Sequence, residues 1–186
     1  AHINQKRASG DPYSMHPIEV ANILTELKLD SATIATGLLH DTIEDTFATY
    51  ETIRGEFGEE VAELVDGVTK ISVYENTAAS NSKAENFRKL ILATSKDIRV
   101  LLVKIADRLH NMRTIQFVKN KEKQERISKE TMEIYAPLAD RMGMNRIRDE
   151  LEDLSFQVLN SEARELIKNR LDEIKDNRTT NVKNVS

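Results

Sequence analysis

Cysteine and tryptophan are both absent from this chain of 186 residues, and aromatic residues make up only 5% of it. Without cysteine the chain can form no disulfide, thiolate metal site or cysteine nucleophile. This composition is compatible with a reducing compartment, and we expect a cytoplasmic protein. Because aromatic side chains are so few, the hydrophobic core must be built mainly from Leu, Ile, Val, Ala and Met.

Long apolar runs are missing as well. No stretch of about 18 apolar residues occurs, so the sequence predicts no helix that crosses a membrane. The first residues lack the apolar stretch of a signal peptide, and the chain opens on Ala1, which indicates a fragment or a processed chain.

A formal net charge of −4 argues against a general nucleic-acid-binding surface. A small anionic ligand could still bind where cations cluster, at Lys6 and Arg7 or at Lys104, Arg108 and Arg113 around Asp107. The alternative is that these are ordinary solvated charges.

Apolar residues recur at a spacing of three to four through most of the chain, and alternating strand patterns are nearly absent. We therefore predict an all-α fold. In the first half of the chain, helices are expected at about 17–27, from a cap at Asp30 or Ser31 to the end of LLHD, at 49–57, around 61–68 and around 87–91. In the second half, one helix is expected from a cap at Asp97 to about Thr114, and another around 127–135 with its end near Pro137. The last two are expected around 147–158 and around 167–174. Residues 75–82 (ENTAASNS) predict a loop, either a plain connector or a lid, and residues 177–186 predict a frayed polar tail.

A set of metal-type ligands is the most informative feature that is present. His40 and Asp41 are neighbours in LLHDTIED, His16 lies in PYSMHP, and Asp107 lies in KIADRLHNMRT. Two neighbouring residues of a helix point about 100° apart, so His40 and Asp41 can reach one ion only near a helix end or bend. Two imidazoles and two carboxylates suit Mn, Fe, Zn or Co better than Ca or Mg. Four ligands on an octahedral ion would leave room for water and substrate.

Each of these residues also has a structural interpretation. A single histidine is often an ordinary surface or core group, and a His-Asp pair arises often by chance. Asp107 could form a salt bridge with Arg108, its neighbour. Glu44 and Asp45, one turn after the His-Asp pair, would either share the site or cap the next turn before Thr46 and Thr49.

A polar stripe adds to the pattern. Asp107, His110, Asn111 and Thr114 fall at i, i+3, i+4 and i+7, on one face of the expected helix. Ile105, Leu109 and Met112 take the opposite face, which is typical of a core. The stripe would therefore face either a cleft or the solvent.

Read together, seven segments become recognisable: QKRASGDPYSMHP, LLHDTIEDT, FGEEVAELVDGVTKI, KAENFRKLIL, DIRVLLVKIADRLHNMRT, EIYAPLADRMG and RDELEDLSF. In this order they resemble the hydrolase domain of the RelA/SpoT homologue family, the enzymes of guanosine tetra- and pentaphosphate metabolism. The wider HD superfamily shares only the His…His-Asp…Asp skeleton, whereas the forms R-x-S-G-[DE]-P-Y, HDxxED and DRLHNMRT point to this branch. The resemblance implies an HD-superfamily helical bundle at residues 1–160, followed by a connector-like helix and polar tail at 161–186.

The resemblance also implies a site around one Mn²⁺ ion. Its ligands would be His16, His40, Asp41 and Asp107. Glu44 and Asp45 would be the catalytic pair, and Arg7, Ser9, Asn111 and Thr114 would hold the guanine nucleotide. The implied reaction removes pyrophosphate from the ribose 3′ position and gives GDP or GTP, with no nucleic acid or membrane as partner.

This chemistry agrees with the residue types. A metal polarises a phosphoryl oxygen and lowers the pKa of bound water toward about 7. One carboxylate near that water can take its proton, and a second can manage protonation of the leaving ribose oxygen. We expect these two roles of Glu44 and Asp45 without assigning which residue has which. The planar face of Arg7 can stack on guanine or pair with phosphate.

Three features depart from the family pattern. Ala8 stands where many members carry Lys, which puts one phosphate contact in question. Asp140 in APLADRMG replaces the usual His, which puts local packing and regulation in question. Long members continue into synthetase and regulatory domains, but no synthetase motif occurs in this sequence, so we expect a hydrolase fragment of a longer enzyme or a naturally split one.

Other functions stay open at this point. A different HD phosphohydrolase would act on deoxynucleoside triphosphates or cyclic nucleotides, and its products would distinguish it. A non-catalytic regulatory module would have a decayed site, whereas the ligands and the Glu44–Asp45 pair are intact here. A broader phosphatase activity on NADPH is a third possibility.

Overall fold

A computed structural model describes residues 5–77 and 97–183 of the chain. The secondary structure of these residues is helical, apart from one isolated β-bridge between Lys6 and Pro12, which confirms the all-α prediction. The chain divides into two compact units, residues 1–119 and 120–186. The boundary expected at residue 160 stays a prediction.

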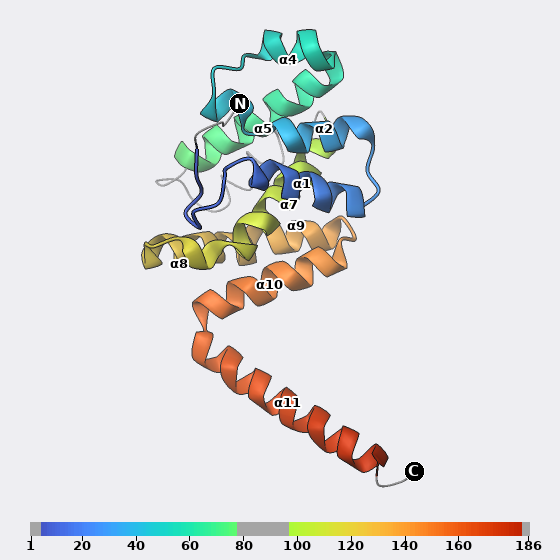
Figure 1. The fold of residues 1–186 in the computed structure, drawn as a ribbon, viewed down its shortest axis with the longest axis vertical. Coiled ribbons are helices and arrows are strands. Elements are labelled where there is room, and N and C mark those ends of the chain that lie inside the picture. The colour runs from blue at the N-terminus through green and yellow to red at the C-terminus, as the bar shows by residue number, and fades with distance from the viewer. Residues whose placement is uncertain (1–4, 78–96, 184–186) are drawn as a thin grey trace. The chain divides into compact units, whose positions relative to one another are not determined.

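Within the described residues, the first unit contains the helices from α1 to η2 (Figure 1). They are α1 (Met15–Glu26), α2 (Ser31–Leu39), α3 (Thr42–Asp45), α4 (Tyr50–Phe57), α5 (Glu59–Thr77), α7 (Arg99–Arg113) and the 3₁₀ helix η2 (Ile115–Phe117). α7 packs against α1, α2 and α5. Val103, Ile105, Ala106, Leu109 and Met112 of α7 are almost fully buried, because this helix forms the centre of the unit.

A glycine sets the distance between α1 and α2. A Cβ atom on Gly37 would lie 2.5 Å from Cδ1 of Leu24 and 3.5 Å from Cγ1 of Val20. No side chain fits there without moving Leu24, so glycine allows α1 and α2 to approach closely. This contact brings the start of α1, which carries His16, toward the end of α2, which carries His40.

Two helix boundaries predicted in the first unit, at Asp30 and near Gly58, are confirmed. The carboxylate of Asp30 accepts a hydrogen bond from the backbone N–H of Thr33 at 3.0 Å. Thr49, for which no cap was predicted, caps α4 through Thr52 N–H at 3.2 Å. Gly58 ends α4 with φ of 88°, a backbone conformation that favours glycine. The cap of α7 expected at Asp97 is one residue off, because Ile98 directly precedes the helix and has no side-chain cap bond. Asp97, one residue before it, accepts from the N–H of Arg99 at 2.9 Å.

Replacing Asp30 with alanine should lower the free energy of unfolding by about 1 kcal/mol, because the first turn of α2 loses its side-chain cap. Urea denaturation followed by circular dichroism would measure the change. The control is Asp66→Ala, which removes only an i,i+4 surface pair with Lys70 and should cost less than about 0.5 kcal/mol. Equal effects of the two changes would contradict the capping role.

Two predictions for the middle of the chain have different outcomes. The loop expected at residues 75–82 is wrong for its first part, because α5 continues through Thr77. The physical reason is that a helix already formed over four turns adds residues at little cost, even small polar ones. Residues 78–82 of the expected loop and the helix expected around residues 87–91 lie outside the described residues.

The second unit contains α8 (Lys121–Glu130), the π-helix η3 (Thr131–Tyr135), α9 (Ala136–Arg141), α10 (Asn145–Leu159) and α11 (Ser161–Lys183). The helix end expected near Pro137 is wrong, since Pro137 lies in the first turn of α9. Proline has no N–H to bond the carbonyl one turn earlier, and the backbone accommodates it with a π turn, in which Ala136 N–H donates to the Thr131 carbonyl. The helical path therefore passes through the proline.

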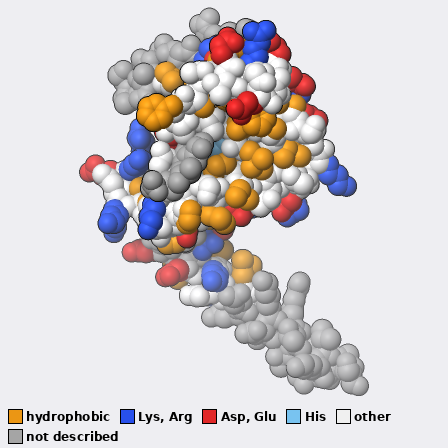
Figure 2. Space-filling view, turned by 45° about the horizontal axis from the view of Figure 1, so that its top comes forward, with side chains coloured by type: hydrophobic (Ala, Val, Ile, Leu, Met, Phe, Trp, Pro, Cys, Tyr) orange, Lys and Arg blue, Asp and Glu red, His pale blue; other side chains and the backbone are white. Residues whose placement is uncertain are grey.

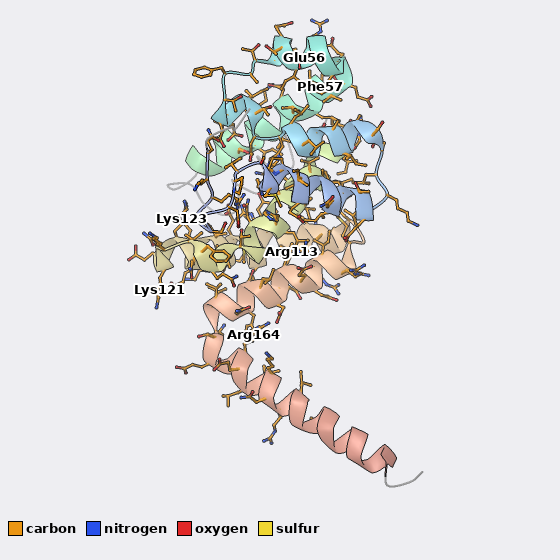
Figure 3. All side chains as sticks on the ribbon, in the orientation of Figure 1. Glu56, Phe57, Arg113, Lys121, Lys123 and Arg164 are labelled. Atoms are coloured by element: carbon orange, nitrogen blue, oxygen red, sulfur yellow. The ribbon has the colours of Figure 1, made fainter. Side chains whose placement is uncertain are left out.

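Polar contacts fix other parts of the second unit. Arg164 of α11, labelled in Figure 3, binds Asp153 of α10 at 2.6 Å. Asp140, which departs from the family pattern, forms an ion pair with Arg148. The frayed tail expected at residues 177–186 is wrong as far as Lys183, where α11 ends.

Apolar side chains also reach the surface, as Figure 2 shows in orange. In the first unit the exposed large ones include Ile18 of α1, Leu38 of α2 and Phe47 after α3. Single exposed apolar residues are normal on protein surfaces. Among the described residues, none of the helices combines the length and apolarity that a membrane crossing requires.

Candidate metal centre

Three separate parts of the first unit carry the predicted metal ligands. His16 is the second residue of α1, and Asp107 lies in the middle of α7. His40 is the C-cap residue of α2, and Asp41 is the N-cap residue of α3. The His-Asp pair therefore lies at a break between two helices, where two neighbouring side chains can face one point, as the sequence predicts.

The side chains of these residues meet in the interior. His16 Nε2 lies 3.2 Å from Asp107 Oδ1 and 3.6 Å from Asp41 Oδ2. His40 Nε2 lies 3.0 Å from Asp41 Oδ1 and 3.8 Å from Asp107 Oδ1. His16, His40 and Asp107 are 2%, 1% and 7% exposed, so these polar groups converge away from bulk water.

The state of His40 tests whether a cation fits. Its Nδ1 lies 2.8 Å from the carbonyl oxygen of Gly37 and must donate a hydrogen bond to it. In the neutral ring the proton is thus on Nδ1, and Nε2 carries a lone pair. Nε2 is buried and makes no hydrogen bond in the structure, although the Asp41 carboxylate is near. A buried lone pair that faces carboxylates is the arrangement that a bound cation satisfies.

The ligand atoms of His16, His40 and Asp107 all lie within 4.8 Å of one another, as a metal site requires. Asp41 borders this group through its distances to both imidazoles. The donors are two nitrogens and carboxylate oxygens, a mixed set that transition metals and zinc accept. The residues present therefore fit a divalent cation.

A buried lysine lies on the other side of Asp107. Lys104 is 4% exposed, and its Nζ lies 3.1 Å from Asp107 Oδ2 and 3.2 Å from Ser72 Oγ. Burial opposes ionisation of Asp107, but Lys104, His16 and His40 together hold its pKa well below the usual range. Burial also opposes a charge on His40, yet the neighbouring carboxylates raise its pKa. Asp107 is therefore ionised and available to a cation through Oδ1.

The two acidic residues of α3 lie beside this group. Burial of the carboxyl group raises the pKa of Glu44, while a hydrogen bond from Ser72 and the charge of Lys104 partly offset the rise. The Tyr13 hydroxyl lies 2.6 Å from Asp41 Oδ2 and 2.9 Å from Asp45 Oδ2, so one proton is shared between two carboxylates. Burial and these two carboxylates raise the pKa of Tyr13, which keeps the hydroxyl a donor. Tyr13 thus links a candidate ligand to the acidic pair.

The polar stripe of α7 faces this same region. Arg7 Nη2 donates to Asn111 Oδ1 at 2.7 Å and lies 3.5 Å from Thr114 Oγ1. Asn111 in turn donates through Nδ2 to Asp107 Oδ1 at 2.6 Å. The stripe therefore connects Asp107 to an arginine that approaches from the N-terminal segment, 104 residues away in sequence.

Ser9, the fourth residue predicted to bind nucleotide, forms its hydrogen bond away from the other three. The hydroxyl of Ser9 donates to Asp11 Oδ2 at 2.7 Å, within the turn that precedes α1. The structure gives it no contact with Arg7, Asn111 or Thr114 among the hydrogen bonds of the described residues. Arg7, Asn111 and Thr114 are thus joined by direct contacts, whereas Ser9 contacts only its own turn.

Two residues of the site were not assigned a role from the sequence. Tyr13 belongs to the quoted GDPY segment, and His110 belongs to the stripe of α7. His110 Nδ1 lies 2.7 Å from His16 Nδ1. Burial, together with the charge of nearby Arg7, lowers the pKa of His110 to about 4, so this ring is neutral near pH 7. Its i+3 spacing from Asp107 was the available signal.

Comparisons with known proteins identify the family to which the chain is similar. A family model described as HD domain matches residues 1–145. A Brucella melitensis protein named GTP pyrophosphokinase rsh is 56% identical over 173 residues, which cover 93% of this chain and 23% of that protein. A Haemophilus influenzae protein named guanosine-3′,5′-bis(diphosphate) 3′-pyrophosphohydrolase is 47% identical over 186 residues, which cover 100% of this chain and 27% of that protein. The chain thus spans about a quarter of the length of these curated relatives.

A solved structure is similar over nearly the whole of both chains. It is that of a metazoan orthologue of SpoT that hydrolyses ppGpp and has a role in starvation responses. The TM-score is 0.63 at 27% sequence identity, and the match covers 86% of this chain and 89% of the other.

Proposed function

The chain belongs to the HD domain family, in its RelA/SpoT branch, and on this basis we propose that it hydrolyses guanosine tetra- and pentaphosphate. The reaction would release pyrophosphate from the ribose 3′ position and leave GDP or GTP. The observation that carries the proposal is the buried meeting of His16, His40 and Asp107, with Asp41 at its border and the acidic pair of α3 beside it. The expected cytoplasmic location stays a prediction.

We propose one Mn²⁺ ion as the cofactor. His16, His40, Asp41 and Asp107 would hold it, because their mixed nitrogen and oxygen donors suit this metal. When bound, such an ion polarises a phosphoryl oxygen and makes nearby water more acidic. Burial of the ligands keeps bulk water from competing for them.

The acidic pair of α3 would handle protons. Glu44 has a raised pKa, which makes it a better proton acceptor than an ordinary glutamate while it is ionised. Asp45 is held by the Tyr13 hydroxyl, so its carboxylate has a fixed direction. One of the two would take a proton from the attacking water, and the other would manage the proton on the leaving ribose oxygen.

Arg7, Asn111 and Thr114 would hold the guanine nucleotide. Their mutual contacts place a guanidinium, an amide and a hydroxyl in one group next to Asp107. A planar guanidinium can stack on a purine or bind phosphate with two parallel hydrogen bonds. Ser9 would join them only if the turn around Asp11 rearranges when nucleotide binds.

Incubation of the purified protein with a 3′-pyrophosphorylated guanosine nucleotide tests the proposal. With Mn²⁺, we expect GDP or GTP and pyrophosphate in equal amounts. Removal of the metal with a chelator should stop product formation, and added Mn²⁺ should restore it. Phosphate or triphosphate as the product, or equal turnover without metal, would contradict the proposed reaction.

A further inference from the structure

Two imidazole rings lie in direct contact beside the candidate metal centre. His16 Nδ1 and His110 Nδ1 are 2.7 Å apart, and the ring centroids are 4.8 Å apart. Both side chains are buried, at 2% and 7% exposure. Two ring nitrogens at this distance need one proton between them, because two lone pairs or two N–H groups would repel. One histidine therefore donates and the other accepts.

The choice between the two decides what His16 can bind. If His110 donates, the proton of neutral His16 is on Nε2, which can donate to Asp107 Oδ1 at 3.2 Å. If His16 donates, its Nε2 carries a lone pair that faces Asp107 and Asp41. Only the second arrangement leaves His16 able to hold a cation.

His40 has no such choice. Its Nδ1 partner is the backbone carbonyl of Gly37, which can only accept, so in the neutral ring the lone pair is always on Nε2. The partner of His16 is a side chain that can donate or accept. The two histidines of the site are therefore built differently, one fixed and one adjustable.

We propose that His110 is a positioning residue that adjusts His16 to the presence of a divalent cation. Without the cation, His110 Nδ1–H donates to His16, and His16 Nε2–H donates to Asp107. With the cation, His16 Nδ1–H donates to His110, and the other proton of the pair resides on His110 Nε2. The two arrangements hold the same two protons, so the rearrangement itself releases none. This inference rests on the proposed metal site.

Nitrogen-15 NMR of histidine-labelled wild-type protein would show the ring proton positions directly, with Zn²⁺ as a diamagnetic probe. In metal-free protein we expect His16 protonated at Nε2 and His110 at Nδ1. With one equivalent of Zn²⁺ we expect the proton of His16 on Nδ1 and that of His110 on Nε2. If His110 keeps the same tautomer in both states, the inference is overturned, and this experiment needs no variant.

Cation affinity provides a second readout. His110→Leu removes the hydrogen-bond partner and should weaken Mn²⁺ binding by about 10- to 100-fold, as loss of a partner behind a metal ligand typically does. His110→Asn, whose amide can donate or accept, should keep most of the affinity. Thr36→Val is the control, because it removes a buried hydrogen bond on α2 to the Ala32 carbonyl. Paramagnetic resonance of free Mn²⁺ measures each affinity, and circular dichroism checks that each variant is folded.

The outcomes separate this inference from the metal site itself. Wild-type protein that binds one Mn²⁺ ion together with His110→Leu protein of equal affinity would overturn the role of His110 alone. Wild-type protein that binds neither Mn²⁺ nor Zn²⁺ would overturn the metal site and this inference together. Weak binding by His110→Leu with near wild-type binding by His110→Asn would support it.

Discussion

Replacing Glu44 with Gln and Asp45 with Asn together should lower turnover of the guanosine nucleotide by at least about 10²-fold, the lower end of what a positioned acid or base contributes. Both changes keep the shape of the side chains but remove their ability to exchange protons. The four candidate ligands and the Arg7–Asn111 contact are untouched, so Mn²⁺ and nucleotide should still bind. Steady-state release of pyrophosphate measures turnover, and calorimetry measures binding.

The single variants and a distant control sharpen this result. Asp45→Asn keeps an oxygen that can accept from the Tyr13 hydroxyl, so local structure should persist. Glu51→Gln on α4 removes an exposed acid away from the site and should leave turnover unchanged. If metal binding disappears in the double variant while the protein remains folded, the acidic pair serves as ligands, and the assignment of roles is wrong.

Replacing Lys104 with Met should destabilise the metal-free protein by about 3 kcal/mol. Removal of one partner of a buried ion pair leaves the other charge uncompensated, and Asp107 is buried among two histidines and Asp41. Methionine fills much of the same volume, so the loss should reflect charge and hydrogen bonding. Urea denaturation with and without Mn²⁺ measures the effect. A bound cation supplies positive charge to Asp107, so saturating Mn²⁺ should make the difference from wild type smaller.

Lys70→Met is the matched control. Lys70 pairs with Asp66 on the surface of α5, and its loss should cost less than about 0.5 kcal/mol in either condition. A loss at Lys104 that is no larger than this, or that grows when Mn²⁺ is added, would show that Lys104 does not compensate the charge of Asp107.

Local sequence signals predicted some of the helix ends. Asp30 bonds a first-turn N–H group of α2, and Gly58 supplies the positive φ that ends α4, so each signal acts within one turn of the chain. The break at His40–Asp41 was also foreseeable, because one ion can be reached by both side chains only there. The candidate ligands lie far apart in the sequence, so no local signal groups them, and the family resemblance was needed to predict them as one site.

Features that depend on contacts between distant residues were harder to predict from the sequence. The sequence places Lys104 and Arg108 near Asp107, but only the fold shows that Lys104 Nζ reaches both Asp107 and Ser72, which lies 32 positions from Lys104. The contact between His16 and His110 joins residues 94 positions apart, and nothing in either segment specifies it. Pro137 predicted a helix end, but neighbouring helices of the second unit hold a π turn and the helix continues. In each case the local sequence allows more than one arrangement, and packing against distant residues selects the one in the structure.

Diffraction from crystals grown with Mn²⁺, measured at the manganese absorption edge, tests the central claim most directly. We expect one anomalous peak in the first unit, with Nε2 of His16, Nε2 of His40 and carboxylate oxygens of Asp41 and Asp107 at coordination distance. A folded protein with no peak there, or with its manganese bound elsewhere, would contradict it.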